Sequence, residues 1–233
     1  MLNFFRSHKL SLFILLFLFL FLPSIYHLSS LFLNASALAP RYTVLIDAGH
    51  GGFDPGKVGI DGSLEKDINL SIALKLKQLL LHNDVEVIMT RESDTALSTD
   101  SDTNKKRADM KNRRDQLTTY QPDLAVSIHQ NSFPSEKQKG AQVFYYVHSK
   151  ESKELAKFLQ EQLVATLDPT NHRTQKSNDS YYLLKGNSCP MVIIECGFLS
   201  NYEEASKLNS EEYQNQIAWA IHLGIMRYLN TYS

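Results

Sequence analysis

Four side chains that could act together in a reaction stand where a predicted strand ends or a predicted helix begins. His50 and His129 each follow an apolar strand, Glu195 ends a third apolar strand, and Glu65 begins the helix after the first strand. In a mostly parallel α/β sheet the carboxyl ends of the strands share one edge, and ligands bind there. We therefore expect these four residues to converge, although they are far apart in the sequence.

Two imidazoles and one carboxylate, with a fourth position left for water, form a catalytic zinc arrangement. This pattern favours one zinc ion bound by His50, Glu65 and His129. Zinc polarises a carbonyl oxygen and lowers the pKa of its water to about 7, whereas a separate carboxylate must move protons. Glu195 suits that role, because it can take the proton of the water and return it to a leaving nitrogen. Asp47, just before the His50 loop, could orient a ligand.

Each of these residues also has a simpler interpretation. Glu65 follows Ser63, a plausible N-cap, so its charge could do no more than complement the helix dipole. A single histidine at a strand end is also a weak signal for a ligand. The remaining candidates fit less well, because His148 ends a strand that could be antiparallel, His172 lies in a polar loop and His222 lies on a core helix.

Hydrophobic patterning predicts a single α/β domain over residues 41–231, with a central, mostly parallel (mixed) sheet flanked by helices on both faces. The predicted strands are residues 43–47, 85–89, 123–128, 140–147 and 191–194, and the predicted helices are residues 64–82, 105–114, 150–167 and 211–230. Residues 168–188 are polar and are interpreted as a mobile loop near a surface groove. The basic stretch 105–114 is interpreted as a solvated helix face from which Arg113 could turn inward.

The overall composition argues against nucleic acid as a partner. The chain has 233 residues and a formal net charge of -1 at pH 7, whereas nucleic-acid-binding domains are usually basic. The two cysteines, Cys189 and Cys196, bracket one predicted strand, and in an extended chain about 23 Å would separate them, which is too far for a disulfide. We expect both to be small buried hydrophobic residues.

The first 39 residues form a predicted signal or anchor segment. Arg6 and Lys9 precede an uncharged apolar run over residues 10–22, and a second apolar stretch covers residues 25–33. The two stretches together could reach the roughly 20 residues that span a bilayer. Sites for cleavage after small residues lie far from the first run, so we favour an uncleaved anchor over a cleaved signal peptide. Either alternative exports the body of the protein.

Six motifs in order resemble the zinc-dependent N-acetylmuramoyl-L-alanine amidases of bacterial cell walls. They are IDAGHGGFDPG (46–56), LEKDINL (64–70), TRESD (90–94), SIHQNS (127–132), GAQVFYY (140–146) and PMVIIECGFLSN (190–201). The resemblance implies one zinc ion on His50, Glu65 and His129, with Glu195 as the catalytic acid and base. It also implies hydrolysis of the amide between the lactyl group of N-acetylmuramic acid and L-alanine in peptidoglycan.

Four further residues are candidates for supporting the metal ligands or contacting substrate: Asp47, Arg91 and Asn131 within these motifs, and Arg113 from the basic stretch 105–114. Two positions depart from the usual pattern. Lys57 stands where the family usually has a small residue, and Ser132 where alanine is common. Neither is a proposed ligand, but Lys57 could alter substrate contacts near the metal.

Within this family the chain is most similar to the sporulation type, which strips peptides from spore cortex so that muramic δ-lactam can form. The N-terminal segment predicts a contact with the membrane, and the sequence leaves open an accessory protein that orders the site. A general cell-wall amidase, a zinc peptidase acting on stem peptides and a catalytically silent wall-binding module are the alternatives. The last is disfavoured because all four chemical residues are present.

Overall fold

The computed structural model describes Phe17, Phe19, Phe21, Leu22 and residues 42–232. The chain divides into two units, Met1–Pro40 and Arg41–Ser233. The predictions for the anchor or signal segment therefore fall almost wholly outside the described residues, of which the four N-terminal ones are helical. Among the described residues, no helix has both the length and the apolar character needed to cross a membrane.

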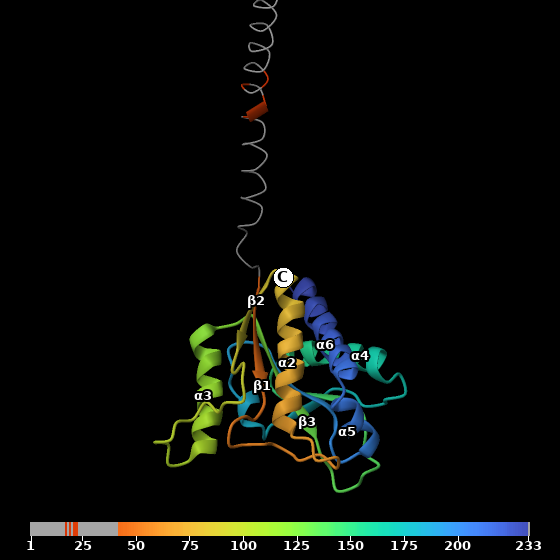
Figure 1. The fold of residues 1–233 in the computed structure, drawn as a ribbon. Coiled ribbons are helices and arrows are strands. Elements are labelled where there is room, and N and C mark those ends of the chain that lie inside the picture. The colour runs from red at the N-terminus through yellow and green to blue at the C-terminus, as the bar shows by residue number, and fades with distance from the viewer. Residues whose placement is uncertain (1–16, 18, 20, 23–41, 233) are drawn as a thin grey trace, which may run out of the picture. The chain divides into compact units, whose positions relative to one another are not determined.

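The body is an α/β fold with one mixed sheet, as predicted (Figure 1). Its strands are β1 (Tyr42–Ala48), β2 (Val85–Met89), β3 (Leu124–Asn131), β4 (Gln142–Tyr146), β5 (Lys176–Asn178) and β6 (Met191–Phe198). Its helices are α2 (Glu65–Leu81), α3 (Lys105–Tyr120), α4 (Lys150–Leu167), α5 (Tyr202–Leu208) and α6 (Glu211–Thr231), with a 3-10 helix, η1, at Tyr182–Leu184.

The sheet has the strand order β2-β1-β3-β6-β4-β5. Strands β2, β1, β3 and β6 pair in parallel, and β4 pairs antiparallel with β6, in line with the prediction for residues 140–147. The carboxyl ends of β1, β3 and β6 therefore lie side by side at one edge, because these three strands are neighbours.

Two hydrophobic clusters cover the two faces of the sheet. Val44 and Ile46 of β1 point into the larger cluster, with α2, α4 and α6, whereas Leu45 points into the smaller cluster, with Leu117 of α3 and Leu183 of η1. This alternation follows from the two-residue period of a strand. Figure 1 shows α2 and α6 next to each other over the sheet.

Several predicted boundaries were wrong. β3 extends to Asn131 and β6 to Phe198, so that His129 and Glu195 lie within their strands, and the pairing of these two strands shifts register between His129 and Asn131. Residues 168–188 contain β5 and η1, and not only a loop, because Leu183 and Leu184 are buried there. Helix α5 has no counterpart among the predicted helices.

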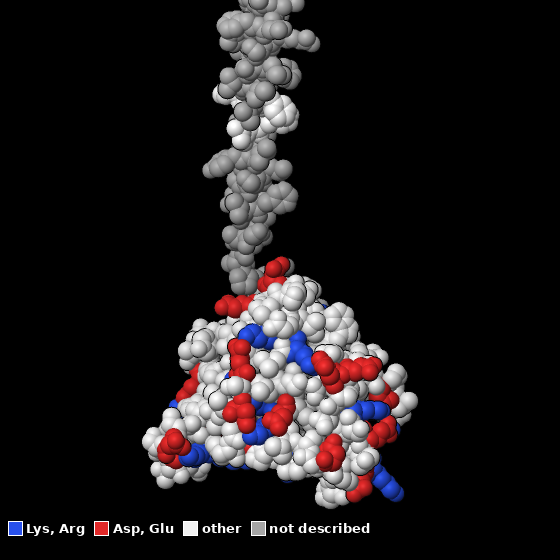
Figure 2. Space-filling model, in the orientation of Figure 1, with Lys and Arg blue, Asp and Glu red and all other residues white. Residues whose placement is uncertain are grey.

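The two cysteines are free, as expected from their spacing. Cys196 is fully buried, but Cys189 is only partly buried, which corrects the expectation that both lie inside the core. Figure 2 shows that acidic and basic side chains are interspersed over the face it displays.

Candidate metal centre and catalytic site

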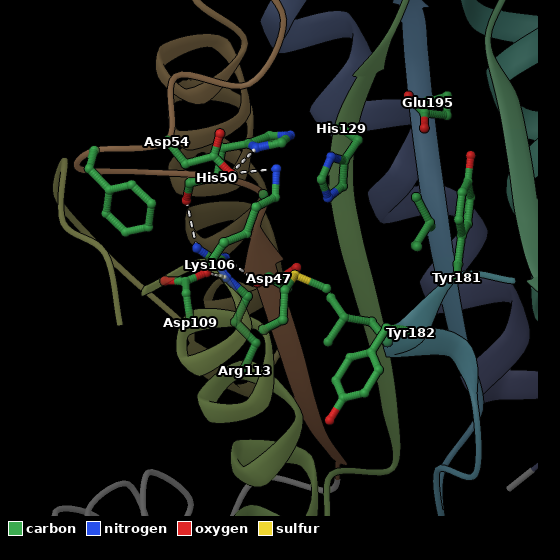
Figure 3. A pocket seen from close by; sticks show the side chains of 15 residues that line it. Asp47, His50, Asp54, Lys106, Asp109, Arg113, His129, Tyr181, Tyr182 and Glu195 are labelled. Carbon is green, nitrogen blue, oxygen red and sulfur yellow. Dashed lines mark hydrogen bonds and ion pairs between the residues drawn. The ribbon is translucent and has the colours of Figure 1, made fainter. Parts of the chain in front are cut away.

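The structure brings His50, Glu65 and His129 together at the predicted edge. One carboxylate oxygen of Glu65, Oε1, lies 3.2 Å from Nε2 of His50 and 3.0 Å from Nδ1 of His129. One ligand atom from each residue lies within 4.8 Å of the other two. Figure 3 shows the rings of His50 and His129 on adjacent parts of the same cavity, with Glu195 on the strand beyond His129.

The loop after β1 holds His50 in a backbone conformation that is rare for this residue type. His50 has a φ of 62°, in the left-handed region that most non-glycine residues avoid. Its carbonyl oxygen accepts a hydrogen bond of 2.6 Å from Nη2 of Arg113. Strain of this kind costs about 1–3 kcal/mol and persists where surrounding contacts fix the conformation.

Two glycines allow the ligands to approach the backbone. A Cβ atom on Gly49 would lie 2.3 Å from the ring of His129, and one on Gly56 would lie 2.6 Å from Oε2 of Glu65. Gly56 also has a φ of 70°. Any side chain at either position would therefore displace a candidate ligand.

Asp54 fixes the orientation of the His50 ring. Its Oδ2 lies 3.0 Å from Nδ1 of His50, which leaves Nε2 to face Glu65. A carboxylate on the far nitrogen is the usual support for a metal-binding histidine, because it sets the tautomer and raises the basicity of the ligand. Burial opposes ionisation of Asp54, but the hydrogen bond from His50 holds the pKa of this carboxyl below its usual range.

Glu65 is buried at the first residue of α2, with 2% of its surface exposed. Its Oε2 accepts a hydrogen bond from the Lys57 amide at 2.8 Å, and its Oε1 accepts one from the Gln130 amide at 3.1 Å. Burial would raise the pKa of Glu65, but the contacts with both histidines lower it far below its usual range. The carboxylate thus faces the histidines and not the solvent at the helix end.

The N-cap prediction for this helix was wrong. The N-cap is Leu64, which makes no side-chain capping bond. The Ser63 hydroxyl instead donates to Asp61 at 2.6 Å. The loop carbonyls of Pro55 and Lys57 take up two amides of the first turn, from Lys66 and Glu65, so that a side-chain cap is not needed.

The donor set fits a metal ion. Two imidazole nitrogens approach a single buried carboxylate oxygen, and all three atoms are of the kinds that bind zinc. Burial would lower the pKa of His129, but Glu65 raises it above the ordinary value. A divalent cation would therefore bind in competition with the proton of His129.

Glu195 lies beside the three-residue cluster and is not part of it. It pairs in register with His129, and its Oε2 is buried without a hydrogen-bond partner among the described residues. Burial raises the pKa of Glu195 to about 7. A carboxylate that is poised near neutral pH and faces a cavity is suited to accept and return a proton.

Asp47 lies beneath the site in a buried hydrogen-bond network. It accepts bonds from Arg113 at 2.6 Å, from Ser127 at 2.5 Å and from Thr90 at 2.9 Å. Burial would raise its pKa, but Arg113 and Ser127 hold the pKa of Asp47 at about 2. Asp47 thus acts on the His50 loop through Arg113, whereas Asp54 makes the direct contact with the imidazole.

Arg91 and Arg113 hold the backbone of the loop. Arg113 is turned inward, with 2% of its surface exposed, and also donates to Asp109 and to the carbonyl of Ala48. Arg91 donates to the carbonyls of Ala48 and Gly49 at 2.9 and 3.0 Å. The charged face of α3 is therefore partly a buried support for the loop and not only a solvated surface.

The cavity beside the ligands has about 960 Å³ of open space. Figure 3 shows Tyr181 near Glu195, with Tyr182 lower on the same wall and Lys106 close to Asp54. A second hollow over the ligands is lined by Lys57, Asn131 and Ser132, among others. Asn131 thus lies at the mouth of the site without contacting the three ligands directly.

Sequence reasoning had not singled out Asp54, Asn69 or Tyr181. Asp54 follows His50 by four positions and Asn69 follows Glu65 by four, so that a search for polar partners close in sequence to each ligand would have found both. The amide of Asn69 donates to the carbonyl of Gly49 at 3.1 Å. Tyr181 lies in residues 168–188, which were predicted to lie near a surface groove, but only the fold brings Tyr181 to the catalytic site.

Comparison with known proteins identifies the family. A model of the family described as N-acetylmuramoyl-L-alanine amidase matches residues 44–227. The germination-specific N-acetylmuramoyl-L-alanine amidase of Bacillus subtilis (strain 168) is 38% identical over 188 residues, which cover 79% of this chain and 78% of that protein.

Solved structures of amidases are also similar to this chain. The CwlD amidase from Clostridioides difficile, solved in complex with the GerS lipoprotein, has a TM-score of 0.80 and 45% identity, covering 82% of this chain and 100% of that one. An N-acetylmuramoyl-L-alanine amidase from Clostridium difficile 630 has a TM-score of 0.74 and 32% identity, covering 83% and 100%. Because the match spans every strand and helix that carries a candidate site residue, this chain belongs to the N-acetylmuramoyl-L-alanine amidase family.

Proposed function

We propose that His50, Glu65 and His129 hold one zinc ion and that Glu195 is the catalytic acid and base of an amidase acting on peptidoglycan. The observation that carries this proposal is the approach of two imidazole nitrogens to one buried carboxylate oxygen, next to a second carboxylate that is not a ligand. Zinc in such a site acts as a Lewis acid toward a carbonyl oxygen and makes water a better nucleophile at neutral pH.

The residues of the chain supply the proton chemistry. Glu195 takes a proton from water as the oxygen–carbon bond to the lactyl carbonyl forms, and gives it to the L-alanine nitrogen as the carbon–nitrogen bond breaks. A pKa of about 7 leaves a large ionised fraction of Glu195 at neutral pH to start this cycle. In the part of the chain that the structure describes, no donor bonds the buried Oε2 of Glu195, so no hydrogen bond within the protein has to break before this oxygen takes a proton.

The substrate in this proposal is spore cortex, from which the enzyme removes stem peptides before muramic δ-lactam forms. The similarity to a germination-specific amidase and to CwlD supports it. Because the CwlD structure was solved with a lipoprotein, we include an accessory protein of that kind as a partner. Action outside the cytoplasm, with an N-terminal signal or anchor over residues 1–39, completes the proposal.

The direct test is digestion of purified cortex and vegetative peptidoglycan, followed by mass spectrometry of the products. Free peptides that begin with L-alanine are expected, and from cortex preferentially. Cleavage only between amino acids would instead identify a zinc peptidase. Equal rates on both substrates would identify a general wall amidase.

A variant at Glu195 separates the catalytic role from metal binding. Glu195→Gln keeps the size of the side chain but cannot carry the proton, so we expect hydrolysis to be lost while about one zinc ion per chain is retained. Metal analysis of the same sample measures whether the zinc is retained. Near-normal turnover by the variant would refute the assignment.

A further inference from the structure

A groove leads away from the catalytic site over β4 and β5, and we call it the stem groove. It has about 790 Å³ of open space. Its lining residues are Asn131, Phe133, Gln138, Gln142, Phe144, Arg173, Lys176, Asn178, Tyr181 and Phe198. Asn131 and Tyr181 also line the hollow that contains the three proposed metal ligands and Glu195, so the stem groove adjoins the site.

The order of the strands gives this groove a direction relative to the reaction. His50 follows β1, His129 lies on β3, Glu195 lies on β6, and β4 and β5 come next in the sheet. The stem groove therefore begins on the side of Glu195 that is away from the metal ligands. In the proposed reaction Glu195 protonates the leaving nitrogen, so that nitrogen must lie on the Glu195 side of the scissile bond.

The charge of the groove matches the product that carries this nitrogen. In a stem peptide whose second residue is a glutamate joined through its side chain and not amidated, a free carboxylate lies next to L-alanine, and the leaving peptide is acidic. The lining of the stem groove contains Arg173 and Lys176 and no acidic residue. Among the described residues, the hydrogen bonds of the Arg173 guanidinium group go to neutral oxygens, although Arg173 also interacts electrostatically with Glu204, which does not line the groove.

Arg173 is held in place as part of a rigid wall. Its guanidinium group lies 4.8 Å from the centre of the Phe198 ring and donates to the Lys139 carbonyl at 2.8 Å and to Gln138 at 2.8 Å. A fixed guanidinium loses little side-chain entropy on binding a carboxylate. Lys176, by contrast, is an exposed residue at the edge strand β5.

The cavity that contains His50, His129 and Glu195 has a different charge pattern from the stem groove. Its lining includes Asp54 and Asp109, and its exposed cation, Lys106, lies 3.6 Å from Asp54. An acidic peptide would meet carboxylates there. The stem groove and this cavity therefore differ in charge, and the anionic peptide end of the substrate fits the stem groove better.

We propose that the stem groove binds the peptide of the substrate, with Lys176 and Arg173 beside the free carboxylate of its glutamate residue. This inference rests on the proposed amidase function. It makes Lys176 a specificity residue that separates glutamate-containing stems from those in which the same carboxylate is amidated.

The test compares two muramyl-peptide substrates that differ only in this carboxylate, free or amidated, using the zinc-loaded protein. For Lys176→Gln we expect kcat/KM to fall about two- to fivefold on the acidic substrate and to stay unchanged on the amidated one, as for an exposed ion pair. The matched control is Lys150→Gln, which removes the same charge at the start of α4. Because β4 runs antiparallel to β6 and α4 follows β4, Lys150 lies at the edge of the sheet opposite the catalytic site.

The outcomes are separable. If the wild-type protein cleaves neither substrate, the proposed function fails. If it cleaves both but Lys176→Gln lowers the two rates equally, or Lys150→Gln reproduces the difference, the assignment of the groove is overturned. Free peptide product should also inhibit the wild-type protein more strongly than Lys176→Gln, and equal inhibition would contradict the proposal.

Discussion

Asp54 provides the most direct check on the geometry of the metal centre. Its Oδ2 bonds Nδ1 of His50 and so leaves Nε2 to face the position of the metal, and its Oδ1 accepts a bond of 3.2 Å from the Gly56 amide. Replacing Asp54 by alanine removes both bonds and frees the His50 ring to rotate or to change tautomer. Replacing it by asparagine keeps an acceptor but removes the negative charge beside Nδ1 of His50.

The expected loss of zinc affinity depends on how many interactions of Asp54 the substitution removes. Loss of a carboxylate that supports a metal-bound histidine typically lowers metal affinity about 10- to 100-fold. We expect Asp54→Asn to lie near the lower end of this range and Asp54→Ala near the upper end, a difference of about 1.4 kcal/mol. Catalytic activity at saturating zinc should recover largely in Asp54→Asn, because the three ligands remain.

The measurement is a zinc affinity titration in competition with a chromophoric chelator. Asp61→Asn is the control, because Asp61 lies in the same loop but its side chain bonds only the amide and hydroxyl of Ser63. An unchanged zinc affinity in Asp54→Ala would refute the role of Asp54. An equal loss in Asp61→Asn would show that the loop conformation, and not the carboxylate on His50, determines the affinity.

Three further predictions concern the ligands and their support. His129→Ala should lose most of its bound zinc, and unchanged metal content in elemental analysis would count against the three-ligand site. Zinc affinity should fall as pH decreases through the raised pKa of His129, because the metal must displace the proton on that residue. The loss should therefore begin at a higher pH than for a histidine with an ordinary pKa. A zinc affinity that does not change with pH would contradict this prediction. Arg113→Ala should lower the free energy of unfolding by about 3–5 kcal/mol in urea denaturation, because it leaves two buried carboxylates unpaired, whereas exposed Arg107→Ala should change it by no more than about 0.5 kcal/mol.

The sequence was enough to predict most of the framework. Strand β2 and helix α4 have the predicted bounds, and the parallel arrangement of β1, β3 and β6 followed from their near-continuous apolar runs. Such segments are predictable because burial on both faces leaves a strong local pattern. Convergence of the four chemical residues was also expected, because strand ends in parallel sheets meet at one edge.

The remaining features depend on contacts that leave no local pattern. Strand β5 has only three residues and is paired solely along one edge, so tertiary contacts and not composition determine it. The buried charge of Arg113 is compensated by Asp47, which lies 66 positions away in the sequence. The extension of β3 past His129 includes a register shift, and such irregularities are common beside active sites.

The parallel pairing of β1 with β3 also links the proposed zinc site to the register of the sheet. Asp47 lies opposite Ser127 in this pairing, and a slip by one residue would turn the side chains of β3, including His129, to the other face of the sheet. Only the native alignment can then complete the ligand set, so a chain with misaligned strands gains nothing from zinc. The metal should thereby favour the correctly assembled sheet by mass action, and zinc present during refolding should raise the yield of native protein.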